Sequence, residues 1–407
     1  MSTTLNAGKA RKSENKECVL SKLLVISSAP ATIVGGKPYL DIKFCEGVNY
    51  YASGWDGQVT GMLRTQENQF AFGRVFERSE LSFDPILLDQ NAPIDKAKLA
   101  EFDVILCSGD NHLYLDMWKI CKDLQTKVVY IIEYDLKTRF QIISLNKNTS
   151  FVGKLSAMFW TLRQEQRRKT AFRQADGLQA NGYPAEISYG RLCRNPVMYL
   201  DNRLKPDMMA TKAEMSDRRV KEKNTPLRLV NSGRLEAMKG AQDLIPIANS
   251  LAKKKVDFRL DVFGTGSLFS EIAEAIGKLN LTDRVNLHEP VDFETELVPY
   301  VRKNADIFLS CHRQSDPSCT YLESMGCGVS VVGYDNRMLQ NLVRESDAGW
   351  TVPLGNWEAL ADRIAKLSQN RYEVTLKSAN ALEFASRHAF DIEFDKRLNH
   401  LKTVQAQ

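Results

Sequence analysis

Short runs of β-branched and other apolar residues alternate with longer amphipathic or charged segments along most of the chain. Strand-length runs with helix-length connections are typical of parallel sheets, because a parallel crossover needs about a dozen or more residues. The pattern therefore predicts an α/β protein with two facing, Rossmann-like parallel-sheet domains. The runs lie at residues 23–27, 104–107, 128–132 and 177–180 in the first half, and at 227–232, 258–263, 285–288, 307–310 and 329–333 in the second.

A polar, charged stretch at residues 204–225 separates the two groups of runs and has the composition of a linker or a peripheral helix. A charged helical pattern at 372–401 predicts a terminal helix that crosses back onto the first domain. Because ligands of open α/β sheets bind at the carboxyl ends of the strands, we expect the site to draw on both domains. The predicted divisions are a disordered tail at 1–20, a first domain at 21–205, a second domain at 206–385 and a C-terminal helix at 386–407.

The composition is that of an ordinary soluble globular protein, with 43% hydrophobic and 26% charged residues, and it excludes collagen-like and low-complexity chains. The formal net charge of +5 favours anionic ligands without requiring nucleic acid. Eight cysteines without a Cys-x-x-Cys pair indicate reduced thiols in a cytoplasmic protein. No run reaches the ~18 apolar residues of a membrane span, so contact with the inner face of a membrane is the closest association expected. Organellar targeting is the alternative for the tail, because Lys9, Arg11 and Lys12 precede any acidic residue.

The segment ADIFLSCHRQSDPSCTYLESMGCGVSVVGYDN, residues 305–336, is the most informative part of the chain. Asp316 followed by Pro317 predicts an N-cap and first turn for a short helix at 318–325. Such a helix offers free backbone N–H groups to a phosphate or to sugar hydroxyls. Glu323, about two turns into this helix, is placed to bond a neutral diol such as a ribose.

This segment resembles the nucleotide-sugar signature of the retaining group 1 glycosyltransferases, glycosyltransferase family 4, which have the GT-B fold. That signature has two glutamates separated by seven residues, and Glu323 with the small residues at 324–328 matches its second half. The resemblance implies that Glu323 binds the ribose. The position of the first glutamate falls on Ser315, beside Asp316. The alternative interpretation is a helix-capping aspartate and a solvated glutamate.

The missing glutamate leaves two ways to hold the donor sugar. Either Asp316 takes the role of the first glutamate, or backbone groups of Ser318, Cys319 and Thr320 hold the sugar. The sequence does not distinguish between these alternatives.

A second match is NSGRLEAMKGAQDLI, residues 231–245, directly after a predicted strand. Arg234 and Lys239 lie five residues apart around a strand-to-helix turn, where a planar fork and a point charge together neutralise a diphosphate. The resemblance implies that this pair holds the leaving diphosphate. The alternative is two solvated cations on a loop.

A glycine loop and a nearby strand complete the resemblance in the second half. Gly264 and Gly266 in LDVFGTGSL lack the third glycine of a dinucleotide fingerprint, so an ordinary tight turn is equally compatible with them. The resemblance implies that this loop lies near the nucleotide, and that the region 284–291 meets the base. Together the matches cover roughly residues 227–367.

Candidate residues in the first half lie after its predicted strands. The pair Gly35 and Gly36 resembles the flexible glycines that approach the donor phosphates, although a plain turn has the same composition. His112 is placed to bond the transferred sugar, with a structural histidine as the alternative. Glu133 and Asp135 are placed to contact the acceptor, with a solvated loop as the alternative.

The segment 154–173 is basic, and its only acid is Glu165. A basic helix with interleaved aromatic residues suits the surface of an anionic membrane, where a lipid-linked acceptor is found. The alternatives are a solvated helix face and a nucleic-acid groove, and no motif supports the latter. The cations are Lys154, Arg163, Arg167, Arg168, Lys169 and Arg173, and the apolar residues are Met158, Phe159, Trp160, Leu162 and Phe172.

These matches predict a hexosyltransferase that moves a sugar from a nucleotide diphosphate to an acceptor hydroxyl, with retention as the resemblance implies. The acceptor expected by analogy is a growing or lipid-linked glycan in polysaccharide or glycoconjugate biosynthesis. No Asp-x-Asp pattern occurs, so the predicted reaction is independent of metal and needs no cofactor besides the donor.

Two other functions stay open at this stage. A nucleotide-sugar epimerase of the same architecture would use Glu133 and Asp135 as carboxylates in the cleft. A non-catalytic nucleotide-binding relative would account for the missing first glutamate.

Overall fold

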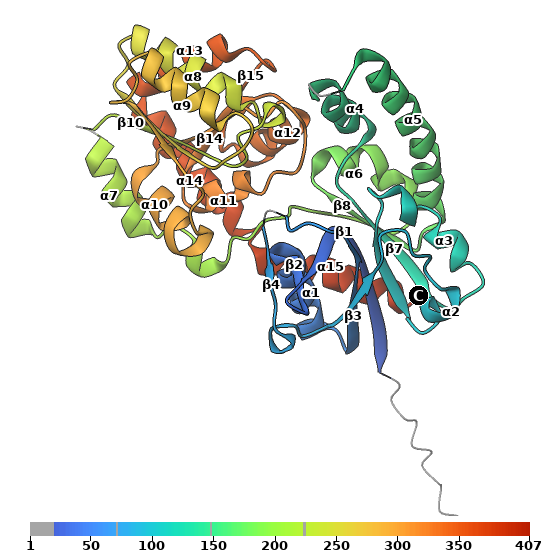
Figure 1. Ribbon diagram of the computed structural model, residues 1–407. Helices are drawn as coiled ribbons and strands as arrows, with labels where there is room; N and C mark the ends of the chain where they lie inside the picture. Colours follow the sequence, from blue (N-terminus) through green and yellow to red (C-terminus); the bar gives the residue numbers. More distant parts are fainter. Residues whose placement is uncertain (1–19, 71, 147–148, 223–224) are drawn as a thin grey trace, which may run out of the picture.

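The computed structural model describes residues 20–407 except 71, 147–148 and 223–224. The predicted disordered tail, apart from residue 20, lies outside the described residues. The described chain forms two lobes, each with a central sheet covered by helices, as Figure 1 shows. The predicted two-domain, Rossmann-like architecture is confirmed by the order of the strands in both sheets.

Among the described residues the first sheet has nine strands, and its parallel part runs in the order β5–β3–β1–β6–β7–β8–β9. The winding reverses between β1 and β6, so that the carboxyl ends of these strands border a crevice. Strands β2 and β4 add an antiparallel ribbon to β1. The strands are β1 (Ser21–Val34), β2 (Lys37–Asp41), β3 (Gly57–Thr65), β4 (Gly73–Val75), β5 (Asp84–Leu88), β6 (Val104–Ser108), β7 (Lys127–Ile132), β8 (Gly177–Asn181) and β9 (Pro196–Tyr199).

Strand β1 is longer than the predicted run because it changes partners along its length. Its register shifts between Ile26 and Pro30, and beyond this irregularity it pairs with β2. Gly35 and Gly36, with φ of 59° and 78°, form the two-residue turn that joins the two strands. Positive φ at both central positions is the requirement of a tight hairpin turn, which explains the glycine pair.

The second sheet has six parallel strands in the order β12–β11–β10–β13–β14–β15 within the described residues. This order has its reversal between β10 and β13 and is that of a dinucleotide-binding sheet. All five predicted runs of the second half are strands, and β15 is an addition. The strands are β10 (Leu227–Ser232), β11 (Phe258–Phe263), β12 (Val285–His288), β13 (Ile307–Ser310), β14 (Ser330–Tyr334) and β15 (Gly349–Val352).

Helices cover both faces of each sheet, and apolar cores lie between the layers. In the first domain they are α1 (Ile42–Gly54), α2 (Lys96–Leu99), α3 (Met117–Ile120), α4 (Leu136–Leu145), α5 (Phe151–Gln174) and α6 (Tyr183–Tyr189). They continue with α7 (Lys212–Glu222), α8 (Leu244–Lys253), α9 (Phe269–Lys278), α10 (Val298–Asn304), α11 (Thr320–Gly326), α12 (Arg337–Ser346), α13 (Trp357–Gln369), α14 (Arg371–Ser386) and α15 (Phe390–Gln405).

The predicted return of the chain end to the first domain is confirmed. The segment predicted as one helical pattern at 372–401 is two helices, with α14 in the core of the second domain and α15 in that of the first. Figure 1 shows α15, in red, passing behind the strands of the first sheet. Phe394, Leu398 and Leu401 bury its apolar face there.

The chain crosses between the domains twice, and the two crossings are bonded to each other. The buried side chain of Asn202 donates to the carbonyl of His388 at 2.9 Å, and the backbone N–H of Phe390 donates to the carbonyl of Leu204 at 2.9 Å. These bonds hold the two connecting segments together at the boundary between the domains.

Candidate functional site

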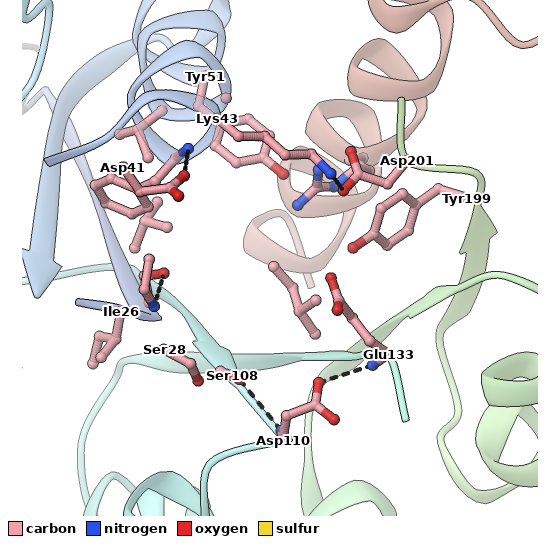
Figure 2. A pocket seen from close by; sticks show the side chains of 18 of the residues that line it. Ile26, Ser28, Asp41, Lys43, Tyr51, Ser108, Asp110, Glu133, Tyr199 and Asp201 are labelled. Carbon is pink, nitrogen blue, oxygen red and sulfur yellow. Dashed lines mark hydrogen bonds and ion pairs between the residues drawn. The ribbon is translucent and has the colours of Figure 1, made fainter. Parts of the chain in front are cut away.

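A polar cavity of about 380 Å³ lies in the first domain, at the carboxyl ends of β1, β6 and β7. Helices α1 and α15 form its opposite wall, and Figure 2 shows side chains from all of these elements around one space. The volume is within the range of small-molecule sites. Its charged lining residues are Asp41, Lys43, Asp110, Glu133, Asp201 and Arg397, and its aromatic lining residues are Phe44, Tyr51, Tyr134, Tyr199 and Phe394.

Glu133, directly after β7, is one of the predicted acceptor residues and lines this cavity. The side-chain amide of Asn181 donates to its Oε1 at 3.2 Å. Burial, followed by the nearby carboxylate of Asp110, raises the pKa of Glu133 to about 7. At neutral pH the carboxyl therefore exists in both protonation states, so that it is available as a hydrogen-bond donor or acceptor.

Asp135, the second predicted acceptor residue, lies instead at the contact between the domains. Its carboxylate forms an ion pair with Arg337 of α12, in which Nη2 and Oδ1 are 2.8 Å apart, and it accepts a hydrogen bond from Ser188. It also caps α4 through the backbone N–H of Thr138. The residue is 2% exposed, so its oxygens are occupied by the fold.

His112 begins a short 3₁₀ helix and packs edge-on against Trp160 of α5, with ring centroids 5.1 Å apart. Two residues earlier, Asp110 occupies the position that lines the cavity after β6. Its carboxylate accepts bonds from Arg139 and from the backbone N–H groups of Glu133 and Tyr134. The structure places Asp110 rather than His112 on the cavity wall.

In the second domain, Arg234 and Lys239 follow β10 at the reversal of the strand order. Arg234 is exposed, whereas Lys239 forms an ion pair with the buried carboxylate of Asp316. Burial alone would raise the pKa of Asp316, but the adjacent Lys239 holds it below its ordinary value. The carboxylate is therefore ionised at neutral pH and fixes the lysine ammonium.

The predicted role of Asp316 as the N-cap of the following helix is wrong. Helix α11 begins at Thr320, and Cys319 is its cap residue. Pro317 therefore stands before the helix rather than in its first turn. The physical reason is the ion pair with Lys239, which draws the Asp316 side chain away from the helix terminus.

The glycines of the second domain let two loops approach each other closely. A Cβ atom on Gly264 would lie 1.9 Å from the carbonyl oxygen of Gly233, and one on Gly266 would lie 2.6 Å from that of Leu235. Both loops follow neighbouring strands, β10 and β11. The predicted glycine loop therefore packs against the loop that carries Arg234.

Glu323 is buried in α11, and burial raises its pKa. Its Oε1 lies 3.4 Å from Nε of Arg203, whose guanidinium lies over the ring of Phe293. Ahead of the helix, the hydroxyls of Ser318 and Thr320 are 2.9 Å apart. The predicted donor residues of 318–323 therefore lie just before and within α11. Arg203, which pairs with Glu323, comes from the segment that connects the two domains.

The segment 315–319 is also where the second domain meets the first. The Ser315 N–H donates to Gln141 at 3.1 Å, and the Lys43 ammonium donates to Cys319 Sγ at 2.9 Å. Burial raises the pKa of the Tyr134 hydroxyl, with Glu133 and Asp316 acting in the same direction and Arg234 opposing them. Tyr134 therefore lies between the cavity of the first domain and the Arg234–Lys239–Asp316 cluster of the second.

Sequence reasoning missed the residues that reach the cavity from outside the strand ends. Lys43 and Tyr51 come from α1, and Arg397 comes from α15, close to the end of the chain. Asp201 follows β9 and pairs with Lys43 at 2.5 Å. No motif or regular spacing in the sequence links these positions. Asp110, by contrast, was identifiable because it follows a predicted strand.

Helix α5 contains the predicted basic segment and has an apolar outer face. Its only acid, Glu165, is buried in an ion pair with Arg168, whereas Arg163 and Arg173 are exposed. None of the described helices is long and apolar enough to cross a membrane. The exposed apolar residues of α5 are Phe151 (75%), Val152 (73%), Leu155 (52%), Phe159 (74%), Trp160 (49%) and Leu162 (44%).

Comparison with known proteins agrees with this architecture. Residues 213–388 match the family model "Glycosyl transferases group 1". Solved structures of HepE from Anabaena in complex with UDP and of a sucrose-phosphate synthase from Thermosynechococcus elongatus superpose with TM-scores of 0.64 and 0.65 at 15% and 16% identity. They cover 95% and 94% of this chain and 100% and 98% of their own. The protein therefore has the GT-B fold, and residues 213–388 of its second half are similar to the group 1 glycosyl transferases.

Among curated proteins, the chain is 28% identical over 194 residues to the amylovoran biosynthesis glycosyltransferase AmsK of Erwinia amylovora. It is 30% identical over 166 residues to WcaL of Escherichia coli (strain K12), provisionally named a colanic acid biosynthesis glycosyltransferase. These alignments cover 44% and 38% of this chain and 44% and 39% of the two relatives. The chain thus matches less than half the length of these relatives.

Proposed function

We propose that the protein is a glycosyltransferase that transfers a sugar from a nucleotide diphosphate to an acceptor hydroxyl in polysaccharide or glycoconjugate biosynthesis. The observation that carries the proposal is the cluster of Arg234, Lys239 and Asp316 at the strand-order reversal of the second domain, opposite the cavity of the first. The match of residues 213–388 and the polysaccharide-related names of AmsK and WcaL support it.

In the proposed reaction the bond between the anomeric carbon and the diphosphate oxygen breaks, and the diphosphate leaves with the electron pair. The acceptor oxygen forms the new bond and loses its proton. Stabilising charge on the departing diphosphate is the main catalytic demand. Arg234 is exposed and free to fork onto the phosphates, and Lys239 is held beside it by Asp316.

Asp316 is suited to take the place of the missing first glutamate. Its Oδ2 pairs with Lys239 and the Gln314 side chain lies close to the carboxylate, whereas its Oδ1 is buried and forms no hydrogen bond in the described part of the chain. A buried carboxylate oxygen without a donor is an acceptor site for a sugar hydroxyl. We assign Oδ1 to a hydroxyl of the transferred sugar, with Gly264, Gly266, the 318–320 segment and Glu323 around the nucleotide.

Retention, hexosyl transfer and independence of metal are part of the proposal. The acceptor attacks on the face from which the diphosphate leaves, and the leaving phosphate takes the acceptor proton. Arg234 and Lys239 supply the positive charge that other sugar transferases obtain through an Asp-x-Asp metal site. The sequence has no such pattern.

The epimerase alternative needs carboxylates that are free to act on the donor sugar. Of the two candidates, Asp135 is bound by Arg337, Ser188 and the start of α4. Glu133 remains, which leaves this alternative with one carboxylate rather than a pair. The Oδ1 atom of Asp316 likewise weakens the argument for a non-catalytic relative.

Thermal unfolding with UDP, GDP and ADP tests the donor site. A ligand at ~100 times its dissociation constant adds about 2.7 kcal/mol to the free energy of unfolding. One nucleotide should raise the melting temperature of the wild type. Arg234→Ala should abolish this increase. The matched control is Arg259→Ala, which should keep the increase, because Arg259 is exposed at the start of β11, away from the glycine loop that follows the strand. Absence of a response to every nucleotide at millimolar concentration would remove the support for the donor site.

We further propose that α5 rests on an anionic membrane surface, where a lipid-linked acceptor is held. The residues 152, 155, 159 and 162 are spaced to lie on one face of the helix. Because Glu165 is buried with Arg168, the charges that this helix exposes are cationic. Apolar side chains with flanking cations match the headgroup region of anionic lipids.

A further inference from the structure

The cavity of the first domain contains two buried polar atoms without a hydrogen-bond partner among the described residues. They are the hydroxyl of Tyr51, a residue that is 2% exposed, and Oδ1 of Asp201. A buried polar atom left unbonded is costly, so such atoms in a cavity wall point to a ligand with hydrogen-bonding groups. Tyr51 comes from α1 and Asp201 from the chain after β9, so the two atoms approach the space from different elements (Figure 2).

The carboxyl of Glu133 faces the same space from the end of β7 (Figure 2). Within the described chain its hydrogen-bond donor is Asn181, and no cation forms an ion pair with it. The other carboxylates of the wall are engaged by the fold, with Asp41 capping α1 and Asp110 bound by Arg139. Glu133, together with Oδ1 of Asp201, therefore has capacity left for ligand hydroxyls.

The charges of the wall favour an uncharged ligand. Four carboxyl groups line the cavity against two cations, Lys43 and Arg397. Lys43 is paired with Asp201, and the Arg397 guanidinium lies over the rings of Tyr199 and Phe394 at 4.2 and 4.5 Å. Asp110 and Asp201 are paired with Arg139 and Lys43, which leaves Asp41 and Glu133 against Arg397. An anionic ligand would therefore meet more unpaired carboxyl groups than cations, whereas hydroxyl groups would find acceptors and donors beside apolar ring faces.

The cavity also adjoins the proposed donor segment. The Lys43 ammonium, which lines the cavity, donates to Cys319 Sγ at 2.9 Å, and Cys319 lies in the 318–320 segment. We propose that the cavity holds the accepting sugar of the acceptor, and that this sugar is uncharged, with its hydroxyls bonded by Tyr51, Asp201 and Glu133. The proposal rests on the proposed glycosyl transfer and adds the class of acceptor to it.

Saturation-transfer NMR on the full chain tests the class of sugar. The probes are the methyl glycosides of glucose, galactose and N-acetylglucosamine, with methyl glucuronide and methyl galacturonide as matched anions. At least one neutral glycoside should bind, and its matched uronide should bind about tenfold or more weakly, because like charges oppose its carboxylate. Glu133→Gln should reduce the difference in affinity between the neutral glycoside and its uronide, because it removes one negative charge from the cavity wall.

Tyr51→Phe tests the contact without endangering the fold, because it removes the hydroxyl and keeps the ring that packs in the core of the first domain. The variant should bind the neutral glycoside roughly fivefold more weakly, which is the effect of one hydrogen bond. Tyr50→Phe is the matched control, because the Tyr50 hydroxyl bonds Asp391 and Asp395 outside the cavity lining. It should leave binding unchanged.

Preference for the uronides, or equal binding of the neutral glycoside by the wild type and Tyr51→Phe, overturns the proposal. If a nucleotide raises the melting temperature and no glycoside binds, the acceptor cavity is refuted while the donor site stands. If a neutral glycoside binds with the predicted variant effects and no nucleotide binds, the sugar cavity stands and the glycosyltransferase proposal fails.

Discussion

The Glu133 carboxyl differs from its neighbours in the cavity because it lacks a cationic partner among the described residues. Asp201 is paired with Lys43 and Asp110 with Arg139, so their charges are compensated. Burial and Asp110 raise the pKa of Glu133 from 4.5 to about 7. The folded protein therefore binds a proton at this residue more tightly than the unfolded chain does.

This difference predicts a pH-dependent gain of stability in Glu133→Gln. The folded-state pKa is raised, so the wild type loses stability as the pH increases from about 4.5 to about 7. The variant has no such loss. It should be more stable than the wild type by about 1–3 kcal/mol above pH 7, and the difference should vanish near pH 4. Urea unfolding at a series of pH values measures it.

Glu80→Gln provides a control of opposite sign. The backbone of Glu77 and the side chain of Arg74 hold the pKa of Glu80 below its ordinary value. Its contribution is therefore present at neutral pH and is lost as the pH falls through the folded-state pKa. This variant should be less stable than the wild type at pH 7 and equal to it in acid. A difference for Glu133→Gln that does not change with pH would contradict the account.

At the residue scale, the sequence predicted the positions that follow strands and missed those that come from elsewhere. Arg234 and Lys239 were identifiable because a strand-to-helix turn carries both, and the structure places them at one strand-order reversal. Tyr51 and Arg397 are 346 positions apart in the sequence. Only the packing of α1 and α15 around the first sheet brings them together, and no local pattern encodes that.

At the scale of elements, periodicity located strands well and helix limits less well. Five of the six described strands of the second sheet were recognisable from continuous apolar runs, which are typical of strands buried on both faces, such as β10 and β11. The strands β2, β4 and β9 were not predicted because they have three to five residues and half-exposed patterns, and the strands β3, β5 and β15 were not predicted either. The start of α11 was mispredicted because an ion pair outside the helix, Lys239 with Asp316, decided where Asp316 points.

Helix α5 yields a prediction at this scale. The wild type should co-sediment with vesicles that contain phosphatidylglycerol, and less so at high salt, because the attraction to its cations is screened. The double change Leu155→Ser and Phe159→Ser should weaken binding by about tenfold or more, since each side chain loses apolar burial in the lipid. Both residues are more than half exposed, so the fold should tolerate the change.

The control for α5 changes two exposed apolar residues elsewhere. Tyr372 and Leu376 lie on α14 in the second domain and are 78% and 48% exposed. The pair Tyr372→Ser and Leu376→Ser should leave vesicle binding unaltered. Equal binding of the wild type to phosphatidylcholine vesicles, or an equal loss in both double variants, would refute a membrane surface on α5.

At the scale of the whole molecule, contacts among the described residues hold the two domains together at several places. The crossing segments are bonded through Asn202 and Phe390, Asp135 pairs with Arg337, and Lys43 reaches Cys319. The sequence predicted two domains and the return of the last helix, because both follow from strand and helix patterns. It did not predict these contacts, since each joins residues from separate domains without a shared motif.

The central claim is that a sugar bound beside Arg234 and Lys239 is transferred to an acceptor between the two domains. Proton and phosphorus NMR of the protein with nucleotide sugars, each with and without the neutral glycosides, tests it most directly. We predict that free nucleoside diphosphate and a new glycoside with the donor's anomeric configuration form only when an acceptor is present, and that Arg234→Ala abolishes both. Conversion of the nucleotide sugar into an epimer without any acceptor would contradict the account.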